Sequence, residues 1–120
     1  MQATAGGASR IITFWRSDCA PCLHELAILP VIAERQPALS ILVLVLKDDG
    51  TAAAAIARDA HPNLRLQHVK AGEEAVLFRQ YGDTNQALPY SVAVAADGRL
   101  CGRHVGLLGI AIADQWALQC

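Results

Sequence analysis

The sequence predicts one α/β domain whose central mixed β-sheet is flanked by helices on both faces. Two observations carry this prediction. Apolar, strand-like runs alternate with segments whose apolar residues recur at helical intervals, which is the pattern of parallel strands joined by helices. Near the C-terminus, two strand-like runs instead follow each other directly across Asp97-Gly98, a hairpin signal that adds antiparallel strands.

The composition is that of a protein with a packed core. The 120 residues are 53% hydrophobic and 18% charged, so a single domain is expected that does not depend on its four cysteines for stability. The formal net charge is −1 and no run of Lys or Arg is present, which argues against a nucleic-acid partner. No apolar run approaches the about 20 residues of a membrane-spanning helix, so no membrane insertion by this chain is expected.

The N-terminal part is predicted to be a leader followed by a strand and a helix. Residues 1–10 are small or polar and include two adjacent glycines, so they are expected to form a flexible leader, with residues 11–120 as the domain. Ile11 to Trp15 is a short apolar run that suits a buried strand. Ala20 to Gln36 carries apolar residues at helical intervals and is predicted to be a helix.

The middle of the chain repeats this alternation of strand and helix. Ile41 to Leu46 is six apolar residues in a row, which indicates a parallel strand covered on both faces. Thr51 is expected to cap a helix from Ala52 to Asp59. Leu64 to Val69 alternates apolar and polar residues, as in an edge strand, and Glu73 to Tyr81 is predicted to be a short helix closed by the glycine that follows.

The last part is predicted to form the hairpin and a final helix. Tyr90 to Ala95 and Leu100 to Val105 are the two hairpin strands, and Ile110 to Leu118 is an amphipathic helix. The expected order is therefore β-α-β-α-β-α-β-β-α, with no internal repeat or linker.

Two cysteines stand where the first strand gives way to the first helix. Cys19 and Cys22 are separated by two residues, and this spacing beside a strand–helix pattern is a redox signature as well as half of a zinc site. Zinc needs two further ligands, but the sequence has no second Cys-x-x-Cys and no His-x3-His pattern. The redox interpretation is therefore favoured, with no metal and no cofactor beyond a Cys19–Cys22 disulfide.

The start of the helix suggests how these thiols would react. The helix dipole and unpaired N–H groups lower the pKa of a thiol at this position from about 8.5 toward neutrality. Cys19 is therefore the expected nucleophile, and Cys22, one turn later and more buried, would attack the resulting mixed disulfide. The carboxylate of Asp18 opposes a thiolate on Cys19. Pro21 suits the first turn of a helix.

Glu25 is a candidate proton acceptor. It lies three residues after Cys22, so both side chains fall on one face of the helix. A partly buried carboxylate would have a raised pKa there and could take or return the proton of Cys22. The alternative is an ordinary solvated helix residue.

Three separate patches of the sequence match one known family. They are Phe14-Trp15 with Cys19-Ala20-Pro21-Cys22 and Glu25, then Tyr81-Gly82 with Leu88-Pro89, and then the hairpin Val92 to Leu100 with Asp97-Gly98-Arg99. The chain thereby resembles the thioredoxin superfamily, and within it the bacterial TlpA/ResA-like thiol–disulfide oxidoreductases. The resemblance implies a thioredoxin fold and exchange of disulfides with protein substrates, as a reductase served by an upstream electron donor.

The resemblance also implies roles for individual residues. The Leu88–Pro89 bond is expected to be cis and to face the cysteines, and the backbone of Leu88 would pair with an extended substrate peptide, as in strand addition. Ala20 and Pro21 would contact the substrate. Trp15 would line the same surface or pack in the core. Thr13 stands where thioredoxins carry a buried Asp.

Other consequences of the resemblance concern the setting. A monomer is expected. The family suggests a role in cell redox homeostasis, with clients in cytochrome c maturation or metal-site assembly. The periplasm or cell envelope is expected if an export segment was removed, and the cytoplasm otherwise. A copper-handling, metallochaperone-like protein that uses the same two thiols is the alternative function, and a redox-inactive adaptor is a third.

Two features are left open by the sequence. Lys47 could pair with a buried acid near the active site or extend into solvent, and the second is favoured. Cys101 and Cys120 should be neighbours at the last strand and helix, but a sheet-to-helix spacing of about 10 Å exceeds the about 7 Å between Cα atoms that a disulfide spans. Both are therefore expected to be free thiols, and a disulfide would argue for an oxidising compartment.

Overall fold

The computed structural model of the protein describes residues 8–59, 61–83 and 85–120, so the leader expected at residues 1–7 lies outside the described residues. The first strand begins at Ala8 rather than at Ile11, because the backbone from Ala8 onward pairs with a later strand near Ala95. Residues 8–10, assigned to the leader from the sequence, are therefore part of the sheet.

In the described residues, five strands form one mixed sheet in the order β3-β2-β1-β4-β5. The strands are β1 (Ala8–Arg16), β2 (Ser40–Lys47), β3 (Leu64–His68), β4 (Tyr90–Ala95) and β5 (Leu100–Val105). β2 is parallel to both β1 and β3, whereas β4 is antiparallel to both β1 and β5. The uninterrupted apolar run is thus a parallel strand paired on both edges, and the alternating run is an edge strand, as predicted.

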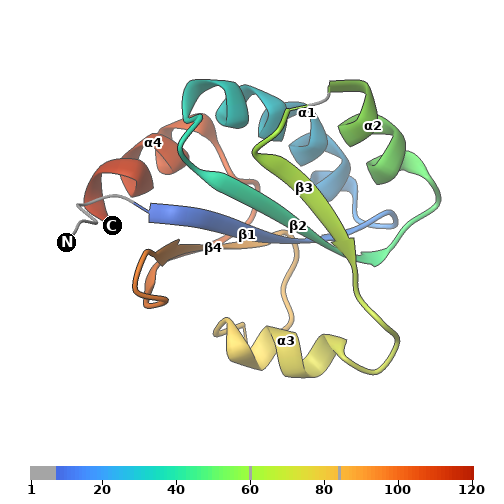
Figure 1. Cartoon of the computed structure of the whole chain (residues 1–120). Helices are drawn as coiled ribbons and strands as arrows, with labels where there is room; N and C mark the ends of the chain where they lie inside the picture. Colours follow the sequence, from blue (N-terminus) through green and yellow to red (C-terminus); the bar gives the residue numbers. More distant parts are fainter. Residues whose placement is uncertain (1–7, 60, 84) are drawn as a thin grey trace.

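Four helices in the part of the chain that the structure describes cover the sheet, on both of its faces. They are α1 (Ala20–Arg35), α2 (Thr51–Asp59), α3 (Glu74–Gln80) and α4 (Ile110–Gln119). α1, α2 and α4 lie on one face, and α3 lies on the other (Figure 1). The predicted fold class and element order are confirmed. No helix in the described part of the chain is long and apolar enough to cross a membrane.

The start of α2 differs from the prediction. Thr51 is the first helical residue and not the residue before the helix. The Asp48 carboxylate accepts hydrogen bonds from the backbone N–H groups of Gly50 and Ala52, and the Asp49 carboxylate accepts one from Thr51. Charged acceptors bind the unpaired N–H groups of a helix start more strongly than a hydroxyl does.

The two faces of the sheet bury separate hydrophobic cores. Ile11 and Trp15 belong to the core under α1, α2 and α4, whereas Ile12 and Phe14 belong to the core under α3. This division follows from the alternation of side chains along a strand. Thr13, between them, therefore lies on the same face as α1.

The last helix is bound covalently to the edge strand. Cys101 and Cys120 form a disulfide with Cα atoms 5.6 Å apart, so the expectation of two free thiols was wrong. The reason is the absence of a side chain at Gly102, where an added Cβ would overlap the indole of Trp116. α4 therefore lies closer to β5 at this end than the usual spacing of about 10 Å between packed layers.

Candidate functional site

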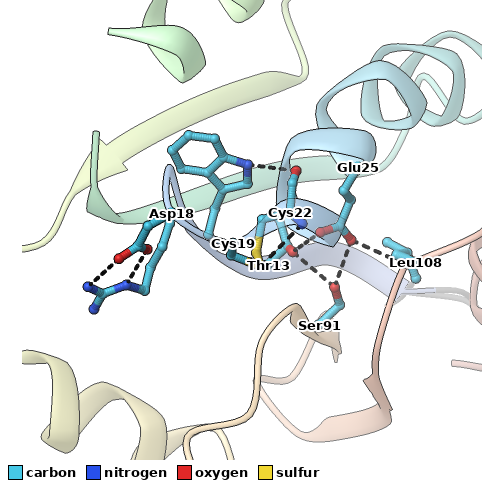
Figure 2. Close-up of a disulfide and its surroundings, with 9 residues drawn as sticks. Thr13, Asp18, Cys19, Cys22, Glu25, Ser91 and Leu108 are labelled. Carbon is cyan, nitrogen blue, oxygen red and sulfur yellow. Dashed lines mark hydrogen bonds and ion pairs between the residues drawn. A yellow bond between two sulfur atoms is a disulfide. The ribbon is translucent and has the colours of Figure 1, made fainter. Parts of the chain in front are cut away.

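The cysteine pair lies where β1 ends and α1 begins (Figure 2). Cys19 is the N-cap of α1, and its Sγ accepts a hydrogen bond of 3.2 Å from the backbone N–H of Cys22. The two cysteines form a disulfide with Cα atoms 5.2 Å apart. Cys19 is partly exposed whereas Cys22 is fully buried, so an external sulfur can reach Cys19 and not Cys22.

The first turn of α1 presents the residues between the cysteines to solvent. Ala20 and Pro21 are both exposed there, at positions that fit the substrate contacts expected from the sequence. Pro21 breaks no helical hydrogen bond, because the first backbone N–H groups of a helix have no partner within it.

Glu25 is fully buried on the side of α1 that faces the sheet. Its Oε1 accepts a hydrogen bond of 3.2 Å from the backbone N–H of Leu108 and lies 3.5 Å from the hydroxyl of Ser91. Its Oε2 accepts a hydrogen bond of 3.4 Å from the hydroxyl of Thr13. Burial raises the pKa of Glu25 from 4.5 to about 7, because the cost of desolvation exceeds what these hydrogen bonds offset.

The raised pKa expected for Glu25 is thus confirmed, and the alternative of a solvated helix residue is wrong. Sequence analysis missed its partners. Thr13 and Ser91 are paired across β1 and β4, and their hydroxyls are 3.0 Å apart. A signal was present, since each is a polar residue inside an otherwise apolar strand. The backbone N–H of Leu108 carries no such signal.

Trp15 belongs to the core. Its side chain is fully buried, and its indole N–H donates a hydrogen bond of 2.8 Å to the backbone carbonyl of Cys22. Of the two alternatives drawn from the sequence, core packing is confirmed and a substrate-lining position is wrong. The contact fixes the first turn of α1 against the end of β1.

The Leu88–Pro89 peptide bond is cis, as predicted. It directly precedes β4, which runs antiparallel to β1 and begins where Tyr90 pairs with Phe14. The bond therefore lies at the same end of the sheet as the cysteine pair. Leu88 is partly exposed, and its backbone makes no hydrogen bond within the part of the chain that the structure describes.

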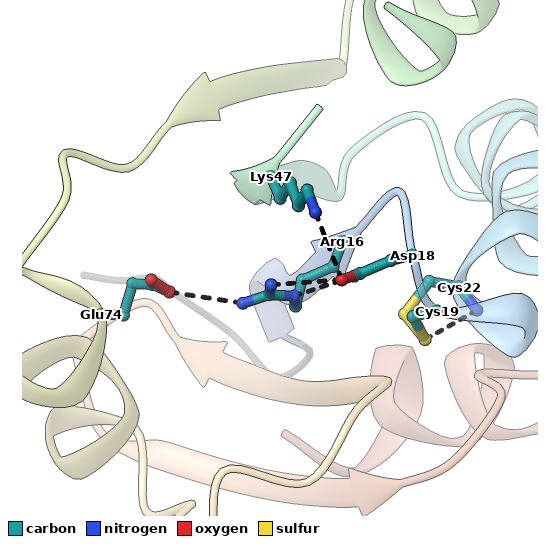
Figure 3. A network of polar contacts seen from close by, with 6 residues as sticks. All are labelled: Arg16, Asp18, Cys19, Cys22, Lys47 and Glu74. Carbon is teal, nitrogen blue, oxygen red and sulfur yellow. Dashed lines mark hydrogen bonds and ion pairs between the residues drawn. A yellow bond between two sulfur atoms is a disulfide. The ribbon is translucent and has the colours of Figure 1, made fainter. Parts of the chain in front are cut away.

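The carboxylate of Asp18, next to Cys19 in the chain, forms ion pairs with two basic side chains (Figure 3). Arg16 Nε and Lys47 Nζ lie 2.9 Å and 3.6 Å from its oxygens. The hydrogen bond from Arg16 lowers the pKa of Asp18. Lys47 is exposed, as the favoured expectation had it, and the acid that it pairs with beside the cysteines is itself exposed and not buried.

These contacts predict the effect of removing the carboxylate. Asp18→Asn is expected to lower the pKa of Cys19 in the reduced protein, because the negative charge beside the thiolate is removed while the charges of Lys47 and of Arg16, which keeps its pair with Glu74, remain. The groups are exposed and screened by solvent, so a shift of about half a unit is expected. Thiolate absorbance followed against pH measures it.

A matched control for this substitution is Asp97→Asn. Asp97 is also exposed and paired with an arginine, Arg99, but it lies in the hairpin turn between β4 and β5. The substitution Asp97→Asn should leave the pKa of Cys19 unchanged. A rise in that pKa in Asp18→Asn, or an equal shift in both variants, would show that the charges around Asp18 do not act on the thiol.

Solved structures with a similar fold agree with this architecture. A thioredoxin-related protein from Neisseria meningitidis serogroup B is 16% identical with a TM-score of 0.69, over 96% of this chain and 90% of that one. StoA from Bacillus subtilis is 18% identical with a TM-score of 0.65, over 93% and 84%. A secreted Mycobacterium tuberculosis disulfide oxidoreductase is 18% identical with a TM-score of 0.65, over 93% and 82%.

These similarities show that the chain has the thioredoxin fold, as the resemblance in its sequence implied. No family model matches the chain, and neither does any curated protein.

Proposed function

We propose that the protein is a thiol–disulfide oxidoreductase of the TlpA/ResA-like type, which reduces disulfides of client proteins through Cys19 and Cys22. The observation that carries this proposal is the arrangement of the two sulfurs on α1. One is partly exposed at the N-cap, and the other is buried on the helix that also carries Glu25. Thiol exchange requires one accessible sulfur and one that attacks from within.

The reaction proceeds in two exchanges. The thiolate of reduced Cys19 attacks one sulfur of a client disulfide, which forms a Cys19–client disulfide and releases the other client sulfur as a thiolate that takes a proton. Cys22 then loses its proton and attacks Cys19 Sγ, which releases the second client sulfur. The client gains two electrons and two protons, and the Cys19–Cys22 disulfide is left for an upstream thiol donor to reduce.

Glu25 takes the proton of Cys22 in the second exchange. A thiol buried in apolar surroundings keeps a high pKa, so Cys22 needs a base to become a nucleophile. A carboxylate with a pKa of about 7 is half ionised near neutral pH, where a base of this strength is most effective. The buried Glu25 thus suits both acceptance of the proton and its return.

Clients would bind across the exposed first turn of α1. Ala20 and Pro21 would contact the client beside its disulfide, and the backbone of Leu88 would pair with its extended chain. The proposal includes a monomeric enzyme and, by the resemblance, clients in cytochrome c maturation or metal-site assembly. No observation favours the copper-binding alternative, which would use the same two thiols.

Reduction of insulin by dithiothreitol tests this proposal. The wild-type protein is expected to accelerate it, and Cys19→Ser to abolish the acceleration. Cys22→Ser is expected to accumulate a disulfide between Cys19 and insulin, because the second exchange cannot follow, and mass spectrometry would detect it. A wild-type protein no faster than Cys19→Ser would refute the function.

A further inference from the structure

We propose that the Cys101–Cys120 disulfide is a positioning element of the exchange site, which holds α4 in place so that the segment before it can bind Glu25. What Glu25 does in catalysis rests on the proposed function. The position of Leu108, which binds Glu25 from within the loop that the disulfide closes, is given by the geometry alone.

The disulfide closes a loop of chain that contains one of the partners of Glu25. Its two cysteines are 19 positions apart, and Leu108 lies between them. The side chain of Leu108 is fully buried, and its backbone N–H donates a hydrogen bond of 3.2 Å to Glu25 Oε1 (Figure 2). The closed loop therefore includes a direct hydrogen-bond donor to the proposed proton acceptor.

The other attachments of α4 are limited. The helix has ten residues, of which Ala113 and Trp116 are buried, and its N-cap Gly109 has no side-chain capping bond. A helix of this length is marginal without tertiary support. Ile112 and Ala117 pack against the core with only part of their surface buried. Asp114 accepts a hydrogen bond of 2.9 Å from Gln36 Nε2 and forms an ion pair with Arg35, but the pair is partly exposed, and such pairs add little. The covalent bond at Cys120 is therefore a main restraint on the C-terminal end of the helix.

Contacts along α4 connect the disulfide with the site. At one end, the indole of Trp116 lies against Gly102, the residue after Cys101. At the other end, Leu108 directly precedes Gly109, the N-cap of the helix. Leu108 and Trp116 belong to the same hydrophobic core as Cys22. Loss of the Cys101–Cys120 disulfide would thus loosen the packing of α4 against the core that excludes water from Glu25.

The surroundings of Glu25 make it sensitive to such a change. The groups that contact its carboxylate are the hydroxyls of Thr13 and Ser91 and the backbone N–H of Leu108, and Cys22 lies three residues earlier on its own helix. No ion pair to Glu25 is formed by the described residues. Burial is the largest cause of its raised pKa, whereas the hydrogen bond from Leu108 lowers that pKa by a smaller amount. Entry of water would therefore outweigh the loss of the Leu108 bond and lower the pKa from about 7 toward 4.5.

The test compares the wild type with a variant that combines Cys101→Ser and Cys120→Ser, both with the Cys19–Cys22 disulfide intact. Carbon NMR titration of the Glu25 carboxyl is expected to show a midpoint that is lower in the variant than in the wild type by about one pH unit or more. In the variant, the Leu108 amide hydrogen is expected to exchange with solvent at least about tenfold faster than the variant's global unfolding would allow. Neither readout requires enzymatic activity.

The matched control is Phe78→Leu, which weakens the separate core under α3, where Phe78 stacks on Phe14. It should lower stability without moving the Glu25 midpoint or selectively exposing the Leu108 amide. If the serine pair does not fold, Cys101→Val with Cys120→Ala removes the same bond with apolar replacements, and the same criteria apply.

The outcomes separate the two proposals. A cysteine-pair variant that loses stability but keeps the wild-type Glu25 midpoint and Leu108 protection would overturn the inference, because the bond would then be a structural staple only. A wild-type protein that fails to reduce insulin would overturn the proposed function and leave the titration result unaffected.

Discussion

Glu25→Gln is expected to make the protein more stable than the wild type at alkaline pH, by about 3 kcal/mol in the free energy of unfolding. The carboxyl keeps its proton up to a pKa of about 7 in the folded protein but only up to about 4.5 when unfolded. Between these values the folded state holds more protons, so wild-type stability falls as pH rises through this window. Each pKa unit corresponds to about 1.4 kcal/mol.

Glutamine carries no charge, so the variant avoids this loss. Its stability should match that of the wild type at pH values below the window and exceed it increasingly above. Urea unfolding on either side of the window measures the difference. Glu34→Gln, on the same helix but exposed, is the control and should show no comparable effect. Equal pH dependence in the wild type and Glu25→Gln would mean that Glu25 is not a buried carboxylate with a raised pKa.

Gly102→Ala is expected to destabilise the protein by about 1–3 kcal/mol. An added Cβ at Gly102 would overlap the indole of Trp116, so α4 or the indole must move. The shift would also strain the alignment of Cys101 with Cys120 at the end of that helix. Chemical unfolding gives the loss of stability, and tryptophan fluorescence of the folded protein reports displacement of the indole.

Gly109→Ala provides the matched control for this substitution. Gly109 is the N-cap of α4, its φ is −97°, and an added Cβ meets no atom within 4 Å. Its effect should lie within about 0.5 kcal/mol. Similar stability losses in the two variants would show that the packing of α4 on the sheet does not depend on the close approach of Trp116 to Gly102.

The parts of the fold that the sequence predicted well are those set by local chemistry. The hairpin strands have the expected bounds, because Asp97-Gly98 forms the turn and Gly98 adopts a φ of +88°. The start of β1 was missed because Ala8 to Arg10 has no apolar pattern, and its pairing with β4 is a tertiary contact. The sequence predicts Thr51 as the cap, whereas the capping contact of Asp48 depends on the conformation of the folded loop.

The same distinction explains what was predicted of the site. The first two turns of α1 hold Cys22 and Glu25, and Cys19 is the N-cap of that helix. Their spacing in the sequence was therefore enough to predict that they share one element. Ser91 and Leu108 reach Glu25 from more than sixty residues away, at sequence separations of 66 and 83. The Cys101–Cys120 disulfide depends on how closely a helix approaches a sheet, which no local pattern of residues specifies.

The proposed function depends on Glu25 taking the proton of Cys22 during thiol exchange. The most direct test is the rate at which the Cys19–client disulfide is resolved, followed against pH in the wild type and in Glu25→Gln. The wild-type rate should rise with pH through about 7, where Glu25 becomes ionised, and Glu25→Gln should lose this step and be slower by about a hundredfold. The same profile and rate in both proteins would contradict the account.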